Sequence, residues 1–194
     1  MKTRIEKGIM RTTLQFSVSF LLAIFVLAAP RMSQAATAGE IDRDVDSALQ
    51  TLYRTTPAAK NMAKIAKGVL VFPDIIKAGL IVGGQYGEGA LRVGGKTTGY
   101  YRTVAASYGL QAGAQSFGYA LFFIDNEGLA YLKNSNGWEI GVGPSVVIVD
   151  EGVARSLTTT TVKSGIYAFI FQQKGLMAGI GIQGSKITKI TPDK

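Results

Sequence analysis

Three lysines have a spacing that would let them bind a negatively charged ligand together. Lys60, Lys64 and Lys67 stand at positions i, i+4 and i+7, which lie along one face of an α-helix. Such a row is either a solvated helix face or a basic stripe that faces anionic lipid. The spacing leaves both interpretations open.

A second basic group lies among predicted turns and tyrosines. Lys96 and Arg102 enclose Tyr100 and Tyr101, and Lys77 stands near an earlier turn. Tyrosine beside Lys or Arg is typical of a membrane–water interface, whereas core packing is the alternative for aromatic residues. Together with the three helical lysines, these three basic residues form the set that we predict to contact lipid.

Composition excludes most catalytic and metal chemistry. The 194 residues include neither His nor Cys, so the chain has no Ser-His-Asp triad, no thiolate nucleophile, no disulfide and none of the usual zinc ligands. Carboxylates such as Asp74 and Glu88 form no motif, and a retaining glycosidase needs a pair about 5 Å apart. The acidic pair Asp150-Glu151 and the hydroxyls of Thr158–Thr161 also lack partners at calcium-binding or catalytic spacing. We expect a protein that is not an enzyme and that uses no metal or cofactor.

Two glycine-rich segments resemble nucleotide-binding loops only superficially. A phosphate-binding loop requires a glycine five residues before the glycine that precedes its lysine, and here Ala90 stands five residues before Gly95. The G-x-G elements of Gly83–Gly89 would need a helix directly after them, but the pattern that follows is that of a strand. We therefore predict β-turns at Gly87–Gly89, as a hairpin tip, and at Gly94–Lys96.

The first 35 residues have the pattern of a secretory signal peptide. A basic start precedes the apolar run Leu14–Ala29, which is followed by Pro30 and by small residues up to Ala35. This run is shorter than the roughly 20 residues that span a membrane, although an uncleaved anchor is the alternative. We expect cleavage after Ala35, or after Ala38, and a periplasmic or secreted protein that can associate peripherally with a membrane. Without a cysteine it cannot be a bacterial lipoprotein.

The remaining residues, 36–194, are expected to form one mildly basic domain. The leader holds five of the 21 Lys and Arg and one of the 13 Asp and Glu, which leaves 16 basic and 12 acidic residues and a net charge of +4. That excess is too small to indicate nucleic-acid binding.

The pattern of this domain changes from helix to strand. Apolar residues recur every three to four positions over 39–67, with a break at Thr55–Pro57 and an end at Gly68. Short apolar or alternating segments follow, among them Val69–Phe72, which Pro73-Asp74 ends, and 157–163, 166–171 and 176–182, the last two joined by a turn at 172–175. One short helix is predicted near 125–135, capped by Asp125. This order predicts an α+β fold, with N-terminal helices packed on a strongly bent antiparallel sheet, either barrel-like or a small sandwich.

The chain resembles the SYLF domain family over about residues 40–190. The matching segments, in order, are Ala66–Pro73 (AKGVLVFP), Lys77–Gly79, Gly83–Gly89, Gly99–Tyr101, Ser107–Ser116, Gly137–Glu139, Lys174–Gly179 and Lys186–Ile190. The resemblance implies lipid binding. Eukaryotic members of the family bind phosphoinositides, and yeast-type members also bind actin, whereas bacterial members are exported single-domain proteins.

For this chain the resemblance implies binding to anionic phospholipid or to a membrane surface of the bacterial envelope. The alternative is a scaffold that binds an envelope protein through an exposed sheet edge or through Thr158–Thr161. The oligomeric state, the lipid and the pathway stay open.

Overall fold

The computed structural model describes residues 36–108, 113–149, 157, 162, 165–175 and 184–193, and the structural statements below concern these residues. The predicted signal peptide, residues 1–35, lies outside them. Among the described residues, eight strands form one sheet in the order β5-β8-β3-β2-β1-β4-β7-β6. Their bounds are β1 Gly68–Gly79, β2 Val82–Val93, β3 Lys96–Tyr108, β4 Gly113–Phe123, β5 Trp138–Glu139, β6 Val146–Val149, β7 Ile166–Gly175 and β8 Lys186–Ile190.

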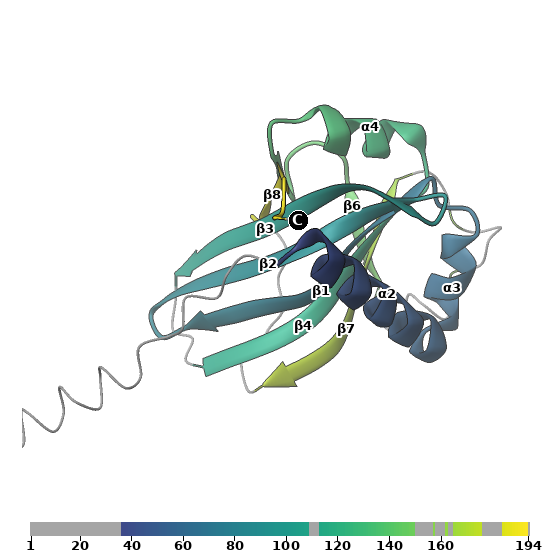
Figure 1. The fold of residues 1–194 in the computed structure, drawn as a ribbon. Coiled ribbons are helices and arrows are strands. Elements are labelled where there is room, and N and C mark those ends of the chain that lie inside the picture. The colour runs from purple at the N-terminus through teal and green to yellow at the C-terminus, as the bar shows by residue number, and fades with distance from the viewer. Residues whose placement is uncertain are drawn as a thin grey trace, which may run out of the picture. The chain divides into compact units, whose positions relative to one another are not determined.

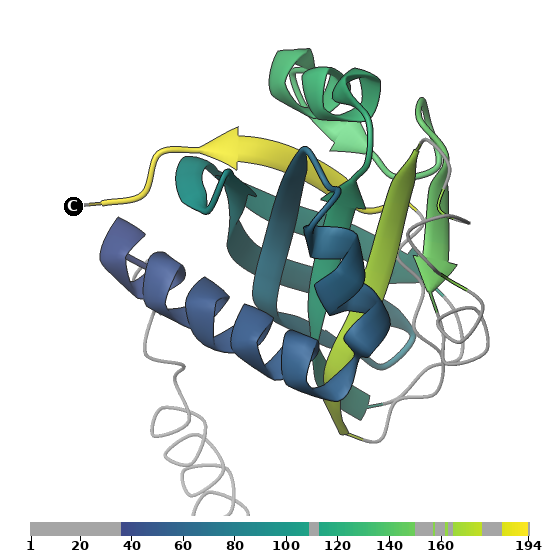
Figure 2. The same cartoon turned by 90° about the vertical axis from the view of Figure 1, so that its right-hand side faces the viewer.

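Three described helices accompany the sheet: α2 (Ala38–Thr55), α3 (Pro57–Ala63) and α4 (Asn126–Asn134). The sheet curls like half a barrel, with α2 and α3 on one face (Figures 1 and 2). We call that face the outer face and the opposite one the inner face. The predicted α+β fold is therefore confirmed, including the short helix near 125–135. One detail differs, because β6 runs parallel to β7 while all other neighbouring strands are antiparallel.

Helix α2 begins at a capping box. The Thr37 side chain accepts a hydrogen bond from the backbone N–H of Glu40 (3.3 Å), and the Glu40 carboxylate accepts one from the backbone N–H of Thr37 (2.8 Å). The apolar stripe of α2, which includes Ile41, Val45 and Leu52, is buried on the sheet. This stripe is the one that the sequence periodicity predicts.

Each face of the sheet carries its own hydrophobic core. The outer core packs α2 and α3 against side chains such as Val71, Phe122 and Phe169, and the rings of Phe122 and Phe169 meet edge to face with centroids 5.2 Å apart. The inner core contains Phe72 and Trp138 and is joined by apolar residues of α4. Alternate residues of one strand therefore serve two separate cores.

A β-bulge in β1 reverses which residues face outward. Strand β1 does not end at Pro73-Asp74, as predicted, but passes through both residues with one extra residue relative to β2 and β4. Proline is tolerated in a central strand at such a bulge. Val71 is on the outer face, so strict alternation would place Ile75 there too. The bulge instead buries Ile75 in the inner core and puts Ile76 on the outer face.

The predicted hairpin tip at Gly87–Gly89 is wrong, because these residues lie in the middle of β2. Because these two glycines have no side chains, they leave room for the bulge of β1. A Cβ on Gly89 would collide with the Val71 carbonyl, and one on Gly87 would lie 2.8 Å from Ile75 Cγ1. The glycines permit a close approach of two strands rather than a turn.

The second helix ends earlier than predicted. Its last residue is Ala63, Lys64 is the C-cap, and Gly68 is the first residue of β1. Lys67 donates its backbone N–H to the carbonyl of Phe123 (2.7 Å), so it already continues the pairing of β1 with β4. Lys60, Lys64 and Lys67 therefore do not form a stripe on one helix.

Other local predictions have mixed outcomes. The turn at Gly94–Gly95 and the cap at Asp125, whose carboxylate accepts from the Gly128 N–H at 2.9 Å, are confirmed. The predicted turn at 172–175 lies inside β7. The predicted strand at 176–182, most of the one at 157–163, Asp150-Glu151 and Thr158–Thr161 lie outside the described residues. Within the described ranges no helix is long and apolar enough to cross a membrane.

Candidate functional site: an exposed apolar end of the sheet

The connection from β1 to β2 and the first residue of β2 carry large aliphatic side chains. Leu80, Ile81 and Val82 are 70%, 53% and 66% exposed, and we call them the hydrophobic tip. Hairpin connections are normally built from Gly, Asn, Asp, Pro or Ser because these residues suit turn geometry and contact with water. Three consecutive exposed aliphatic residues at a tip therefore call for an explanation other than the turn itself.

Exposed apolar residues continue from the tip along the outer face. Ile76 pairs with Tyr86, and Tyr86 pairs with Val104, so the three lie side by side on adjacent strands. They are 57%, 45% and 46% exposed. The same register adds one lysine at each end, because Val104 pairs with Lys186, and Ile76 is joined to Lys174 through Ser116.

We call this row the open row: Lys186, Val104, Tyr86, Ile76, Ser116 and Lys174. It crosses six strands, about 24 Å at roughly 4.8 Å per strand. The next row toward the tip is made of small exposed residues, Ala106, Gly84, Ala78 and Ala114. Figure 1 shows the strands continuing past α2 toward this end, which we call the open half of the outer face.

A charged pair borders the open row on the side toward the helices. Arg102 and Glu88 are cross-strand neighbours whose side chains meet at 3.3 Å. Glu88 also accepts a hydrogen bond from the Tyr86 hydroxyl (2.6 Å), and the Arg102 guanidinium lies 5.5 Å from the centre of the Tyr86 ring. Burial, followed by the hydrogen bond to Glu88 and its charge, raises the pKa of Tyr86, which Arg102 partly opposes. These contacts hold the exposed tyrosine in place and neutralise Arg102.

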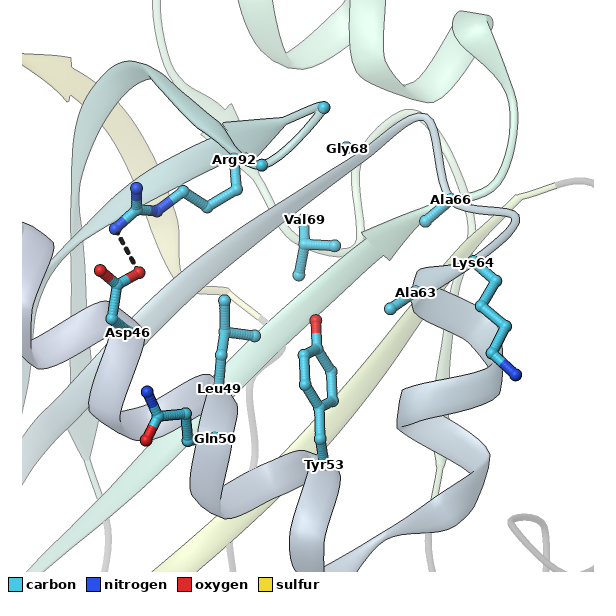
Figure 3. Close-up of a pocket in the computed structure, with 12 residues that line it drawn as sticks. Asp46, Leu49, Gln50, Tyr53, Ala63, Lys64, Ala66, Gly68, Val69 and Arg92 are labelled. Atoms are coloured by element: carbon cyan, nitrogen blue, oxygen red, sulfur yellow. Dashed lines mark hydrogen bonds and ion pairs between the residues drawn. The ribbon is translucent and has the colours of Figure 1, made fainter.

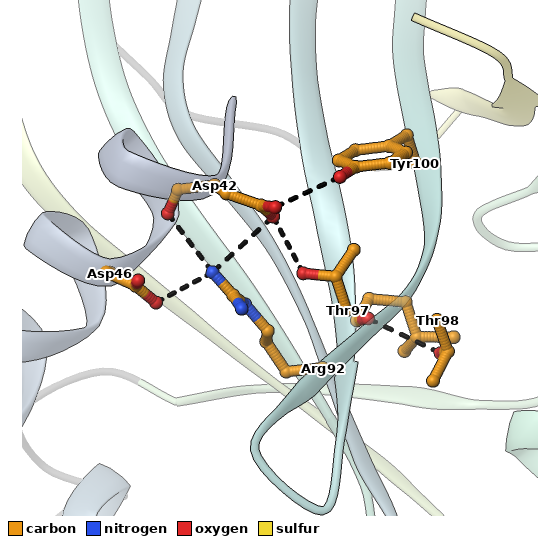
Figure 4. A network of polar contacts seen from close by, with 7 residues as sticks. Asp42, Asp46, Arg92, Thr97, Thr98 and Tyr100 are labelled. Carbon is orange, nitrogen blue, oxygen red and sulfur yellow. Dashed lines mark hydrogen bonds and ion pairs between the residues drawn. The ribbon is translucent and has the colours of Figure 1, made fainter. Parts of the chain in front are cut away.

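The other half of the outer face carries a polar network that fastens α2 to the sheet. Arg92 Nη2 lies 2.7 Å from Asp46 Oδ1 and 3.5 Å from Asp42 Oδ1 (Figure 4). Asp42 also accepts hydrogen bonds from Thr97 (2.7 Å) and Tyr100 (3.0 Å). Burial, together with the hydrogen bond to Asp42, raises the pKa of the Tyr100 hydroxyl.

A cavity of about 610 Å³ lies beside this network, between α2, the end of α3 and the β2–β3 turn. Leu49 and Val69 supply apolar walls, and the Tyr53 hydroxyl points into the space (Figure 3). The volume suits a small molecule. The two cationic side chains that line the cavity have different partners. Arg92 is bonded to carboxylates, and Lys64 donates a hydrogen bond to the Asn61 side chain at 3.3 Å. The balanced charge of Arg92 gives the cavity little selectivity for an anion.

The six predicted lipid-contacting residues are not brought together. Lys60 and Lys64 are exposed on α3 and at its C-cap, Lys67 is exposed just before β1, and Lys96 is exposed at the start of β3. All four are therefore on α3 or beside the end of the sheet where β1 begins. This end is opposite to the hydrophobic tip.

The other two predicted residues lie elsewhere. Lys77 is half-buried on the inner face, because the bulge before it reverses the alternation, and it pairs with Gln85 and Gln115. Arg102 is on the outer face beside the open row, but it is paired with Glu88. Lys77 therefore lies on the face opposite to the open row, and Arg102 already has an anionic partner.

Sequence reasoning missed the tip and both flanking lysines. One signal was present, because Leu80-Ile81-Val82 is a run of three large aliphatic residues placed directly between two glycines. The lysines had no local signal, since strand register alone places Lys174 and Lys186 in one row.

Neither a search for metal-binding groups nor the comparison with known proteins adds to this description. The described residues hold no group of three or more acidic, His or Cys side chains placed to bind a metal ion. No protein-family model and no curated protein matches the chain.

Proposed function

We propose that the protein binds peripherally to membrane surfaces that contain anionic lipid. The observation that supports this most is the hydrophobic tip, where Leu80, Ile81 and Val82 are all more than half exposed. Water contact with these side chains is unfavourable, whereas insertion at the boundary of headgroups and acyl chains removes it. Full burial of one such side chain contributes about 1.5–3 kcal/mol, so three suffice for reversible association.

The resemblance to SYLF domains supports the same function, because it implies lipid binding. The net charge of +4 over residues 36–194 favours anionic over neutral surfaces. The proposal includes location in the bacterial envelope after signal-peptide cleavage, and no catalytic activity. An envelope protein that binds the same apolar surface is the alternative.

Co-flotation with vesicles tests the proposal. Residues 36–194, the compact unit that contains every described element, are mixed with vesicles of phosphatidylcholine alone or with added phosphatidylglycerol. We expect flotation with the anionic vesicles, and a loss of about tenfold or more in the triple variant Leu80→Ser, Ile81→Ser, Val82→Ser.

The matched control removes exposed aliphatic side chains elsewhere. Val147 and Ile148 on β6 are both 42% exposed, and they lie beside the start of β7, away from the tip. Replacing both with Ser should leave flotation unchanged. A wild-type protein that stays unbound, or a triple variant that floats as well as wild type, would refute the proposal and favour the protein-partner alternative.

A further inference from the structure

We propose that Lys174 and Lys186 are the lipid-phosphate contacts of this protein, and that the sheet meets an anionic bilayer tip first with the open row at headgroup level. This inference rests on the proposed function. It assigns the electrostatic part of binding to two residues outside the set of six predicted from sequence.

The geometry of β1 sets the depth of the open row. Ile76 is four residues before Leu80, about 13 Å along a strand. Side chains at a membrane interface enter roughly 5–10 Å into the boundary of headgroups and acyl chains. When the hydrophobic tip is inserted to this depth, the open row stands beside the phosphates, and Tyr86 occupies the interfacial position that tyrosine favours.

The register of the sheet places the two lysines at the two ends of this row. Lys186 follows Val104 at one end, and Lys174 follows Ser116 at the other. Both are exposed. The row can therefore offer its two cations to the phosphates, while the hydrophobic tip below it reaches the acyl chains.

A β-bulge in β7 determines the direction of Lys174. Phe171 is opposite Gly118 and faces the outer core. Regular alternation would make Gln173 the next outward residue, opposite Ser116. Gln172 instead has a positive φ of 53°, and the register shifts so that Lys174 lies opposite Ser116. Bulges re-aim side chains in this way, and here the result is a lysine on the open face.

The neighbouring charges distinguish the two lysines. Arg102 is neutralised by Glu88, so it adds little attraction. Glu139 is the cross-strand neighbour of Lys186 on the side away from the row, and its negative charge partly offsets that lysine. Lys174 has no acidic side chain opposite it in the described strands. We therefore expect Lys174 to contribute more than Lys186.

Charge reversal tests the assignment. The variant Lys174→Glu, Lys186→Glu is compared with Lys60→Glu, Lys64→Glu, which changes the net charge equally on and beside α3. Partitioning is measured with the phosphatidylcholine–phosphatidylglycerol vesicles at low and high salt. At low salt the first variant should bind about tenfold more weakly than wild type, or more weakly still. Its binding should also depend less on the salt concentration. At about 0.1 M salt the second should change binding by less than about threefold, because its charges lie beyond the roughly 10 Å screening length from the surface.

A gain of binding provides the complementary test. Glu139→Lys should strengthen binding to the anionic vesicles by about fivefold and leave binding to phosphatidylcholine vesicles unchanged. If wild type floats but the Lys60/Lys64 variant is the one that loses binding, or if both double variants bind equally, this assignment is overturned and the proposed function survives. If wild type floats with neither vesicle, the proposed function itself fails.

Discussion

The two halves of the outer face are built from the same strands and differ in what lies over them. In the half under α2 and α3, Val71 and Phe122 are completely buried. In the open half, Ile76 on the same strand as Val71 is 57% exposed, and the described residues place nothing over it. Both halves have apolar side chains, so composition alone does not decide which of them belong to a core.

The two halves also differ in how they use charge. The covered half pairs Arg92 with two carboxylates of α2, and these contacts close the surface. The open half pairs Arg102 within the sheet and leaves lysines at the two ends of its apolar row. Apolar area edged by lysines is typical of a surface that meets a separate, negatively charged partner.

The largest predicted difference is in stability. Phe122→Ala removes a buried ring from the covered half and should lower the free energy of unfolding by about 3–5 kcal/mol. Ile76→Ala on the open half should change it by no more than about 0.5 kcal/mol. Urea unfolding of both variants gives these values from the shift in midpoint at constant slope. A large loss for Ile76→Ala would show that the open half is part of a core, and the distinction between the halves would be wrong.

The two arginines of the outer face give a smaller contrast. Arg92→Ala leaves Asp42 and Asp46 without their cation at the helix–sheet contact and should cost about 1–3 kcal/mol. Arg102→Ala should cost less, about 1 kcal/mol, because Arg102 is 41% exposed and contacts one carboxylate, and because Glu88, which is only 8% exposed, keeps the hydrogen bond from Tyr86. Thermal unfolding of both variants measures the difference. Equal losses would mean that fastening α2 is not the main role of Arg92.

Much of the fold could be predicted because its signals are local. The α2 stripe, the Asp125 cap and the Gly94–Gly95 turn each depend on residues within a few positions of one another. The missed features depend on residues distant in sequence. The local pattern of Gly87 and Gly89 predicts a turn, whereas these glycines leave room for the bulge of β1 and so depend on Val71 and Ile75 of another strand.

The candidate site was harder to predict for the same reason. Its lysines are separated from the hydrophobic tip by about 100 residues along the chain, and only the strand order joins them. The bulges in β1 and β7 each change the face on which a lysine lies, and so Lys77 is on the inner face and Lys174 on the outer. A pattern with a period of two cannot locate an inserted residue.

The third contrast concerns the start of α2 and separates the stability of the covered half from binding by the open half. Thr37→Ala removes the cap and should cost about 1 kcal/mol. The hydrogen bonds from the Thr37 backbone and side chain lower the pKa of Glu40. A carboxyl group whose pKa is lower in the folded state stabilises above its unfolded pKa, about 4.3, and loses that contribution as the pH falls through the folded value.

Glu40→Gln should therefore be less stable than wild type at pH 7, and the difference should disappear well below pH 4. Circular dichroism during urea unfolding at both pH values measures it. Because the cap lies beside Asp193, beyond the end of β8 that is away from the hydrophobic tip, vesicle binding of Glu40→Gln at pH 7 should equal that of wild type. A loss of binding in this variant would mean that α2 itself contacts the membrane. The helix-covered half would then have to open to bind lipid, and the assignment of stability to the covered half and of binding to the open half would be wrong.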